Sequence, residues 1–207
     1  MAPQHSPPAS AFTYPQSYSF PPFFTLQPNL QTRLSQLRKW SRLIQRYCRH
    51  EHIFKLSLVT ALDTTLFKNA SLRKRLSLND ALQVVDWMTR DEGGRRAEWI
   101  DGGVEANGGT VWVFWKRPEE WADVVASWVE ETGQRNTVLT LYELMNGEMT
   151  VGQGMISREQ RLDMSAHGML DFHGMDAELF HRCLAVLVKR GKAQVFGSED
   201  QQGVKFF

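Results

Sequence analysis

The chain has 207 residues, of which 42% are hydrophobic and 23% charged, and its formal net charge is +1. This composition is typical of a globular protein with one domain or two small ones. Its apolar runs are far shorter than the roughly 20 residues that span a bilayer. The two cysteines, Cys48 and Cys183, are too few for a disulfide framework. The first residues also lack the basic and apolar regions of a secretory signal, so we expect a cytoplasmic protein.

The low net charge conceals an uneven distribution along the sequence. Between positions 31 and 75 there are eleven basic residues and only two acidic ones, Glu51 and Asp63, which gives this segment a net charge of +9. Such a segment is compatible with a solvated helix face or with an anionic partner such as a nucleic acid. Both interpretations therefore have to be considered.

The N-terminal part divides into two segments. Residues 1–11 are rich in Pro, Ser, Ala and Gln and are predicted to be disordered. Residues 12–28 combine prolines with six aromatic residues, Phe12, Tyr14, Tyr18, Phe20, Phe23 and Phe24. Prolines disfavour a helix, so an extended or polyproline backbone is expected. Since exposed rings are costly, this arm must pack on its own domain or on a partner, and the residues alone leave both alternatives open.

Capping residues and apolar periodicity predict the elements of the first half. Asn29 and Ser77 are good N-caps, and the second predicted helix directs Leu78, Leu82, Val85 and Met88 inward. The expected elements, in chain order, are a helix over 29–48, a strand or helix over 53–62, a helix over 77–90, and a hairpin of 98–101 with 110–115. The residues at 53–58 could pair with that hairpin.

The second half repeats this order of elements. A helix is expected from Pro118 to Gly133, and Asp176 is expected to cap another whose inward face is Phe180, Leu184, Leu187 and Val188. The other expected elements are a short helix over 138–145, a loop over 148–172, and a hairpin of 193–196 with 203–207. We therefore predict an α+β protein with two tandem winged-helix domains, each made of three helices and a β-hairpin wing. Domain 1 spans 29–117, and domain 2 spans 118–207 with a loop insertion at about 148–172.

The sequence contains none of the common catalytic or metal-binding motifs. The chain has no Gly-x-Ser-x-Gly elbow or phosphate-binding loop, and the glycines at 102–109 suit the tip of a hairpin. His50, His52 and the group His167, His173, His181 and Cys183 lack metal-ligand spacing. We therefore expect no enzyme activity, no cofactor and no metal site.

Nucleic-acid binding is the natural alternative for a winged-helix fold. The helices in the recognition position, however, carry acidic residues: Asp80 and Asp86 in the first half, Asp176 and Glu178 in the second. Acidic side chains are repelled by phosphates, which dominate the affinity of such complexes. The alternative function is therefore a nucleic-acid-binding protein that uses the basic surface of residues 31–75 instead.

The run from Tyr18 to Asn29, Tyr-Ser-Phe-Pro-Pro-Phe-Phe-Thr-Leu-Gln-Pro-Asn, resembles the N-terminal signature of the vacuolar protein sorting-associated protein 25 family. Members of this family are the small subunits of the ESCRT-II complex. Further matches follow in the family's order at 115–121, 139–144, 146–148, 172–174 and 203–207. Together they extend over nearly the whole chain from Tyr18 onward.

The resemblance implies a scaffold without catalysis, present in two copies per complex and bound to the two larger ESCRT-II subunits. By that analogy the partner-binding arm comprises residues 12–28, and the contact is made by Pro21, Pro22, Phe23 and Phe24. The second domain would recruit and activate the ESCRT-III subunit that starts filament assembly, through Val138, Leu139 and Thr140. The protein would be cytoplasmic and recruited indirectly to the endosome membrane, where ubiquitinated cargo is sorted into multivesicular bodies.

Overall fold

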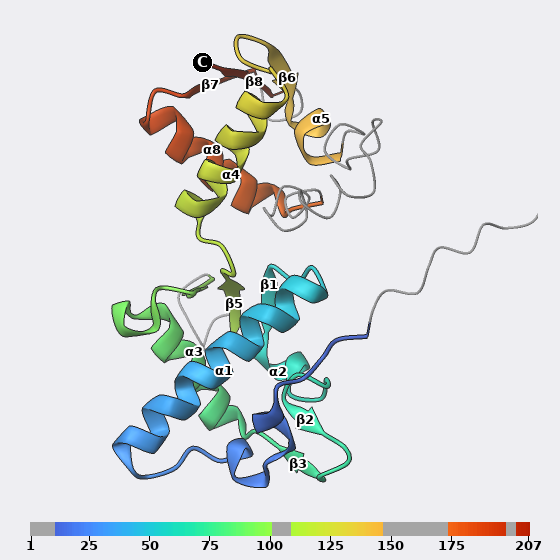
Figure 1. Ribbon diagram of the computed structural model, residues 1–207, viewed down its shortest axis with the longest axis vertical. Coiled ribbons are helices and arrows are strands. Elements are labelled where there is room, and N and C mark those ends of the chain that lie inside the picture. The colour runs from blue at the N-terminus through green and yellow to red at the C-terminus, as the bar shows by residue number, and fades with distance from the viewer. Residues whose placement is uncertain (1–10, 101–108, 147–173, 198–201) are drawn as a thin grey trace, which may run out of the picture. The chain divides into compact units, whose positions relative to one another are not determined.

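The computed structural model describes residues 11–100, 109–146, 174–197 and 202–207 (Figure 1). The chain divides into two compact units, Met1–Trp115 and Lys116–Phe207. The predictions for residues 1–10, for most of the glycine-rich tip at 102–109 and for the loop at 148–172 lie outside the described residues. Among those that are described, no helix has both the length and the apolar character needed to cross a membrane.

The first unit contains the helices and strands of a winged-helix domain, preceded by the aromatic arm. Its elements are η1 (Gln16–Ser19), η2 (Pro21–Phe24), α1 (Leu30–His50), β1 (Lys55–Ser57), α2 (Leu58–Ala61), β2 (Lys68–Asn69), β3 (Lys74–Arg75), α3 (Leu78–Thr89), η3 (Asp91–Gly93), β4 (Ala97–Trp99) and β5 (Thr110–Val113). Both predicted caps are confirmed. The Asn29 side chain accepts a hydrogen bond from the Thr32 N–H at 3.1 Å, and Ser77 accepts one from the Asp80 N–H at 3.0 Å.

The sheet of the first unit has three antiparallel strands in the order β1-β5-β4. Lys55 pairs with Trp112, and Ala97 pairs with Val113. The predicted pairing of residues 53–58 with the hairpin is therefore confirmed, and α2 follows this strand directly. The small antiparallel ribbon of β2 and β3 was not predicted, because each strand has only two residues and no apolar alternation.

The core of the first unit includes residues from α1, α3, the sheet and the arm. On α3 the buried residues include Ala81, Val85 and Met88, at helical spacing. The prediction that Leu78 points inward is wrong, since 42% of its surface is exposed. Leu78 is the first residue of the helix and lies one turn before Ala81, where the buried face begins.

The expectation of an extended arm holds at Pro15, Phe20 and Thr25, but it is wrong for residues 16–19 and 21–24. The arm forms two short 3-10 turns, and Figure 1 shows it beside β2 and β3. In η2 the Phe23 N–H donates to Phe20 O at 2.9 Å and the Thr25 N–H donates to Pro22 O at 3.3 Å. The prolines occupy the first two positions of η2, where a missing N–H breaks no hydrogen bond of the turn.

The second unit is a second winged-helix domain. Its described elements are α4 (Pro118–Glu131), β6 (Val138–Thr140), α5 (Leu141–Asn146), α8 (Ala177–Lys189), β7 (Ala193–Phe196) and β8 (Gly203–Phe206). Helix α8 packs against α4, and the strands form an antiparallel sheet in the order β6-β8-β7. The Asp176 cap is confirmed, because its side chain accepts from the Glu178 N–H at 2.9 Å.

Two local predictions for the second unit are wrong. The predicted helix over 138–145 begins as strand β6, in which Val138 pairs with Lys205, and only then continues as α5. Val138 and Thr140 are β-branched, which favours a strand once a pairing partner is present. Val188, expected to face inward, is 44% exposed, whereas Leu179 is buried on α8.

The two cysteine thiols are buried, and burial raises the pKa of Cys48 and of Cys183 from 9.0 to about 12. The thiols ionise more readily after unfolding, so the free energy of unfolding should fall as the pH rises from 9 toward 12. The expected slope is about 1.4 kcal/mol per pH unit for each thiol. Urea unfolding at a series of pH values measures this slope. It should be shallower in the Cys48→Ala, Cys183→Ala double variant, and equal slopes in both proteins would contradict the prediction.

Candidate partner-binding surfaces

Tyr18 fixes the first turn of the arm against the first unit. Its hydroxyl lies 2.9 Å from Lys68 O and within hydrogen-bond distance of Thr65 O, and the Asn69 side-chain amide donates to Tyr18 O at 2.9 Å. The Tyr14 ring stacks on Tyr18 with the centroids 4.2 Å apart. Burial raises the pKa of Tyr18 well above its usual value, so this hydroxyl stays protonated near neutral pH.

The two phenylalanines of η2 pack around one tryptophan of α1. The Phe23 ring is stacked almost parallel on Trp40, with centroids 4.3 Å apart, and Phe24 meets the same indole edge-on at 5.7 Å. The Trp40 indole N–H donates to Phe23 O at 3.1 Å. Only 3% of Phe23 and 2% of Phe24 is exposed, so both rings belong to the core of the unit.

A buried glutamine of α1 secures the backbone of the arm. The Gln36 side-chain nitrogen donates to Pro22 O at 3.0 Å and to Thr25 O at 3.1 Å. Its side-chain oxygen accepts from the Gln27 N–H at 2.9 Å. These contacts hold both ends of η2 at fixed distances from α1, so the turn is ordered without a partner.

Among the exposed residues of the arm, Phe20, Pro21 and Pro22 are consecutive and apolar, and we call these three the arm ridge. Phe20 is 60% exposed, and both prolines are exposed as well. Phe23 and Phe24, which were predicted to contact the larger subunits, lie in the core of their own unit, where Trp40 offers them a complementary surface. Phe20 was not among the predicted contact residues, although it is an aromatic residue directly before Pro-Pro.

The three residues predicted to contact ESCRT-III lie together on β6. Val138 is 54% exposed, Leu139 is half-buried and Thr140 is exposed, as the alternation of a strand requires. Strand β6 is an edge of its sheet within the described residues, since it pairs there only with β8. Thr140 directly precedes α5: its N–H donates to the Glu143 carboxylate at 2.8 Å, and this hydrogen bond lowers the pKa of Glu143.

The side chains relevant to a metal or nucleic-acid site lie partly within the described residues. Among the residues that the structure describes, no three His, Cys, Asp or Glu side chains are grouped to hold a metal ion. His167 and His173 lie outside that part of the chain. On α3, Asp86 forms an ion pair with Arg90, so part of the basic charge near this helix is neutralised within the chain.

Comparisons with known proteins point to one family. A family model described as ESCRT-II complex subunit matches residues 17–159, a range that includes the arm ridge and β6. The chain is 37% identical over 196 residues to vacuolar protein-sorting-associated protein 25 of Xenopus laevis, covering 95% of this chain and 99% of the relative. It is 36% identical over 199 residues to the human protein of the same name, covering 96% and 99%.

Solved structures show the same relationship. Subunit VPS25 of the endosomal trafficking complex ESCRT-II matches with a TM-score of 0.71 and 28% identity, covering 93% of this chain and 98% of that one. A chain of the endosomal complex ESCRT-II (VPS22/VPS25/VPS36) matches with a TM-score of 0.70 at the same identity and coverage. The chain belongs to the ESCRT-II vacuolar protein-sorting-associated protein 25 family.

Membership of this ESCRT-II family establishes three points. The predicted fold class is confirmed, because the matched VPS25 structure has tandem winged-helix domains. The family to which the chain belongs consists of subunits of the endosomal trafficking complex ESCRT-II. The nucleic-acid alternative is not favoured by any of these matches.

Proposed function

We propose that this chain is a non-catalytic scaffold of ESCRT-II that docks on the two larger subunits of the complex through its arm ridge. The solved ESCRT-II complex contains VPS22 and VPS36 beside VPS25, and the relatives of those two proteins are the proposed partners. In this proposal each complex holds two copies of the chain. The chain is cytoplasmic and is recruited to the endosome through the complex.

The observation that carries this proposal is the division of the arm into an inner and an outer side. Phe23 and Phe24 hold the turn against Trp40, and Phe20, Pro21 and Pro22 remain in solvent. An exposed aromatic residue next to two prolines is a typical docking element for an apolar pocket. Because Gln36 already orders the turn, little conformational entropy is lost when a partner binds it.

The second unit is proposed to recruit and activate the ESCRT-III subunit that starts filament assembly. The support is the edge strand β6, where Val138 is exposed, followed by Tyr142 of α5, which is 73% exposed. Exposed apolar side chains beside an unpaired strand edge suit a protein partner. In this account the arm holds the chain in ESCRT-II, and β6 contacts the next complex during sorting of ubiquitinated cargo.

Co-expression with the two larger subunits tests the assembly proposal. The three chains should co-purify, and light scattering after size exclusion should give two copies of this chain per complex. Failure of the chain to co-purify with either larger subunit would overturn the proposed function. A mass corresponding to one copy would overturn the stoichiometry alone.

Val138→Lys should weaken binding of the ESCRT-III subunit about tenfold, because it places a charge on the proposed apolar contact. Biosensor titration of the purified complex measures the effect. The matched control is Val188→Lys on α8, since Val188 is 44% exposed in the same unit and lies outside β6. Equal affinities for both variants would remove β6 from the ESCRT-III contact, whereas assembly with the larger subunits should be unchanged in each.

A further inference from the structure

A polar groove lies between α1 and α3 of the first unit, outside the arm ridge and β6. It is lined by Arg33, Leu37, Gln83, Asp86, Trp87 and Arg90 and holds about 170 Å³ of open space. Pockets for drug-sized molecules measure about 300–1,000 Å³. The groove therefore has room for a single side chain of a partner rather than for a cofactor.

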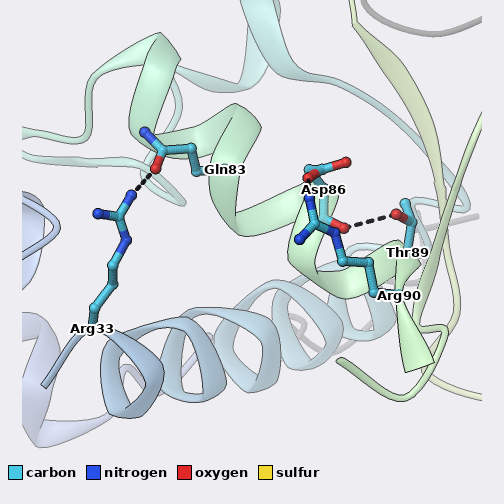
Figure 2. Close-up of polar contacts among 5 residues, drawn as sticks. All are labelled: Arg33, Gln83, Asp86, Thr89 and Arg90. Carbon is cyan, nitrogen blue, oxygen red and sulfur yellow. Dashed lines mark hydrogen bonds and ion pairs between the residues drawn. The ribbon is translucent and has the colours of Figure 1, made fainter. Parts of the chain in front are cut away.

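The two arginines of the groove have different partners. Arg90 forms an ion pair with Asp86 one turn earlier on α3. Arg33 instead donates to the side-chain oxygen of Gln83, a neutral group (Figure 2). Within the described residues no carboxylate forms an ion pair with Arg33, so its positive charge is not neutralised there.

Trp87 also lines the groove. Only 8% of this residue is exposed, and its indole N–H is buried without an acceptor among the residues that the structure describes. Because this N–H has no surface of its own, an arriving group is recognised by Arg33, and a guanidinium with a neutral partner favours an acceptor that carries negative charge.

We propose that this groove receives the carboxylate of an aspartate or glutamate from one of the larger ESCRT-II subunits. The inference rests on the proposed function and adds a second, charged contact to it. Arg33 lies one helical turn from Gln36, which holds the arm, so the groove continues the proposed interface along α1. The arriving carboxylate pairs with Arg33, while Gln83 releases the guanidinium.

Gln83→Glu tests the proposal because it places a carboxylate of the chain itself opposite Arg33. The internal ion pair should leave the melting temperature of the free chain unchanged or higher, yet weaken binding to the larger subunits about tenfold. A residue that only supports the fold could not change stability and binding in opposite directions. Asn79→Asp on α3 is the charge-matched control, since Asn79 is exposed and outside the groove, and its affinity should equal that of the wild type.

Arg33→Gln gives an independent test, with Arg33→Lys as the conservative variant. The first should weaken binding about tenfold and remove part of its salt dependence, and the second should restore part of the affinity. Arg38→Gln, at an exposed position on the same helix, is the control. Wild-type affinity in Arg33→Gln would overturn the groove proposal, whatever Gln83→Glu does to stability. The proposed function would still stand if Phe20→Ala weakened binding. Wild-type affinity in both Arg33→Gln and Phe20→Ala would overturn the groove proposal and the proposed function together.

Discussion

Phe24→Ala is expected to lower the free energy of unfolding of the first unit by about 3–5 kcal/mol, the usual cost of truncating a buried phenylalanine. Phe24 is only 2% exposed and contacts the rings of Tyr18, Phe23 and Trp40. Because a small domain is stable by only about 5–15 kcal/mol, this single change removes much of its margin. Urea unfolding followed by tryptophan fluorescence measures the loss.

Phe20→Ala is the matched control for that experiment. It deletes the same ring four residues earlier, where the side chain is 60% exposed, and should change the free energy of unfolding by less than about 0.5 kcal/mol. Equal losses in the two variants would show that the arm is not divided as described. A negligible loss in Phe24→Ala would show that the arm is not part of the core in solution.

The same Phe20→Ala variant is expected to lose affinity for the larger ESCRT-II subunits by about 100-fold or more. Truncation of a central aromatic anchor of an interface typically costs about 2–4 kcal/mol, and most interface residues cost far less. Affinity is measured by titrating the purified larger subunits onto immobilised variant chains. Phe207→Ala is the matched control, because Phe207 is 49% exposed and lies in the second unit.

Wild-type affinity in Phe20→Ala would contradict the ridge as the docking element. A stable Phe207→Ala protein with the same loss would show instead that the effect follows from any exposed phenylalanine. Together with Phe24→Ala, this series separates the two roles of the arm, since one variant should lose stability and the other should lose binding.

Local signals in the sequence were sufficient for most helix ends. Asn29, Ser77 and Asp176 cap the helices that they were predicted to cap, because capping depends on residues within one turn. Gly133 and Gly191 end helices with φ near +70°, a conformation that favours glycine. The repeated order of these local elements was enough to predict two winged-helix domains.

Long-range contacts account for what could not be predicted. The burial of Phe23 depends on Trp40, seventeen residues away, so no local pattern could separate the inner from the outer side of the arm. Strand β6 exists because it pairs with β8, which begins more than sixty residues later. In the groove, Arg33 contacts Gln83, which is fifty positions away in the sequence. That the Trp87 N–H has no acceptor can be recognised only once the packing is known.

Photo-crosslinking from the arm in the assembled complex tests the central claim most directly. A photoreactive phenylalanine analogue at position 20 should crosslink to one of the larger ESCRT-II subunits, and the same analogue at position 207 should not. The account predicts a crosslink from the ridge because Phe20 faces outward from a turn that Trp40 and Gln36 hold in place. Crosslinks from position 20 that form only within the chain itself would contradict it.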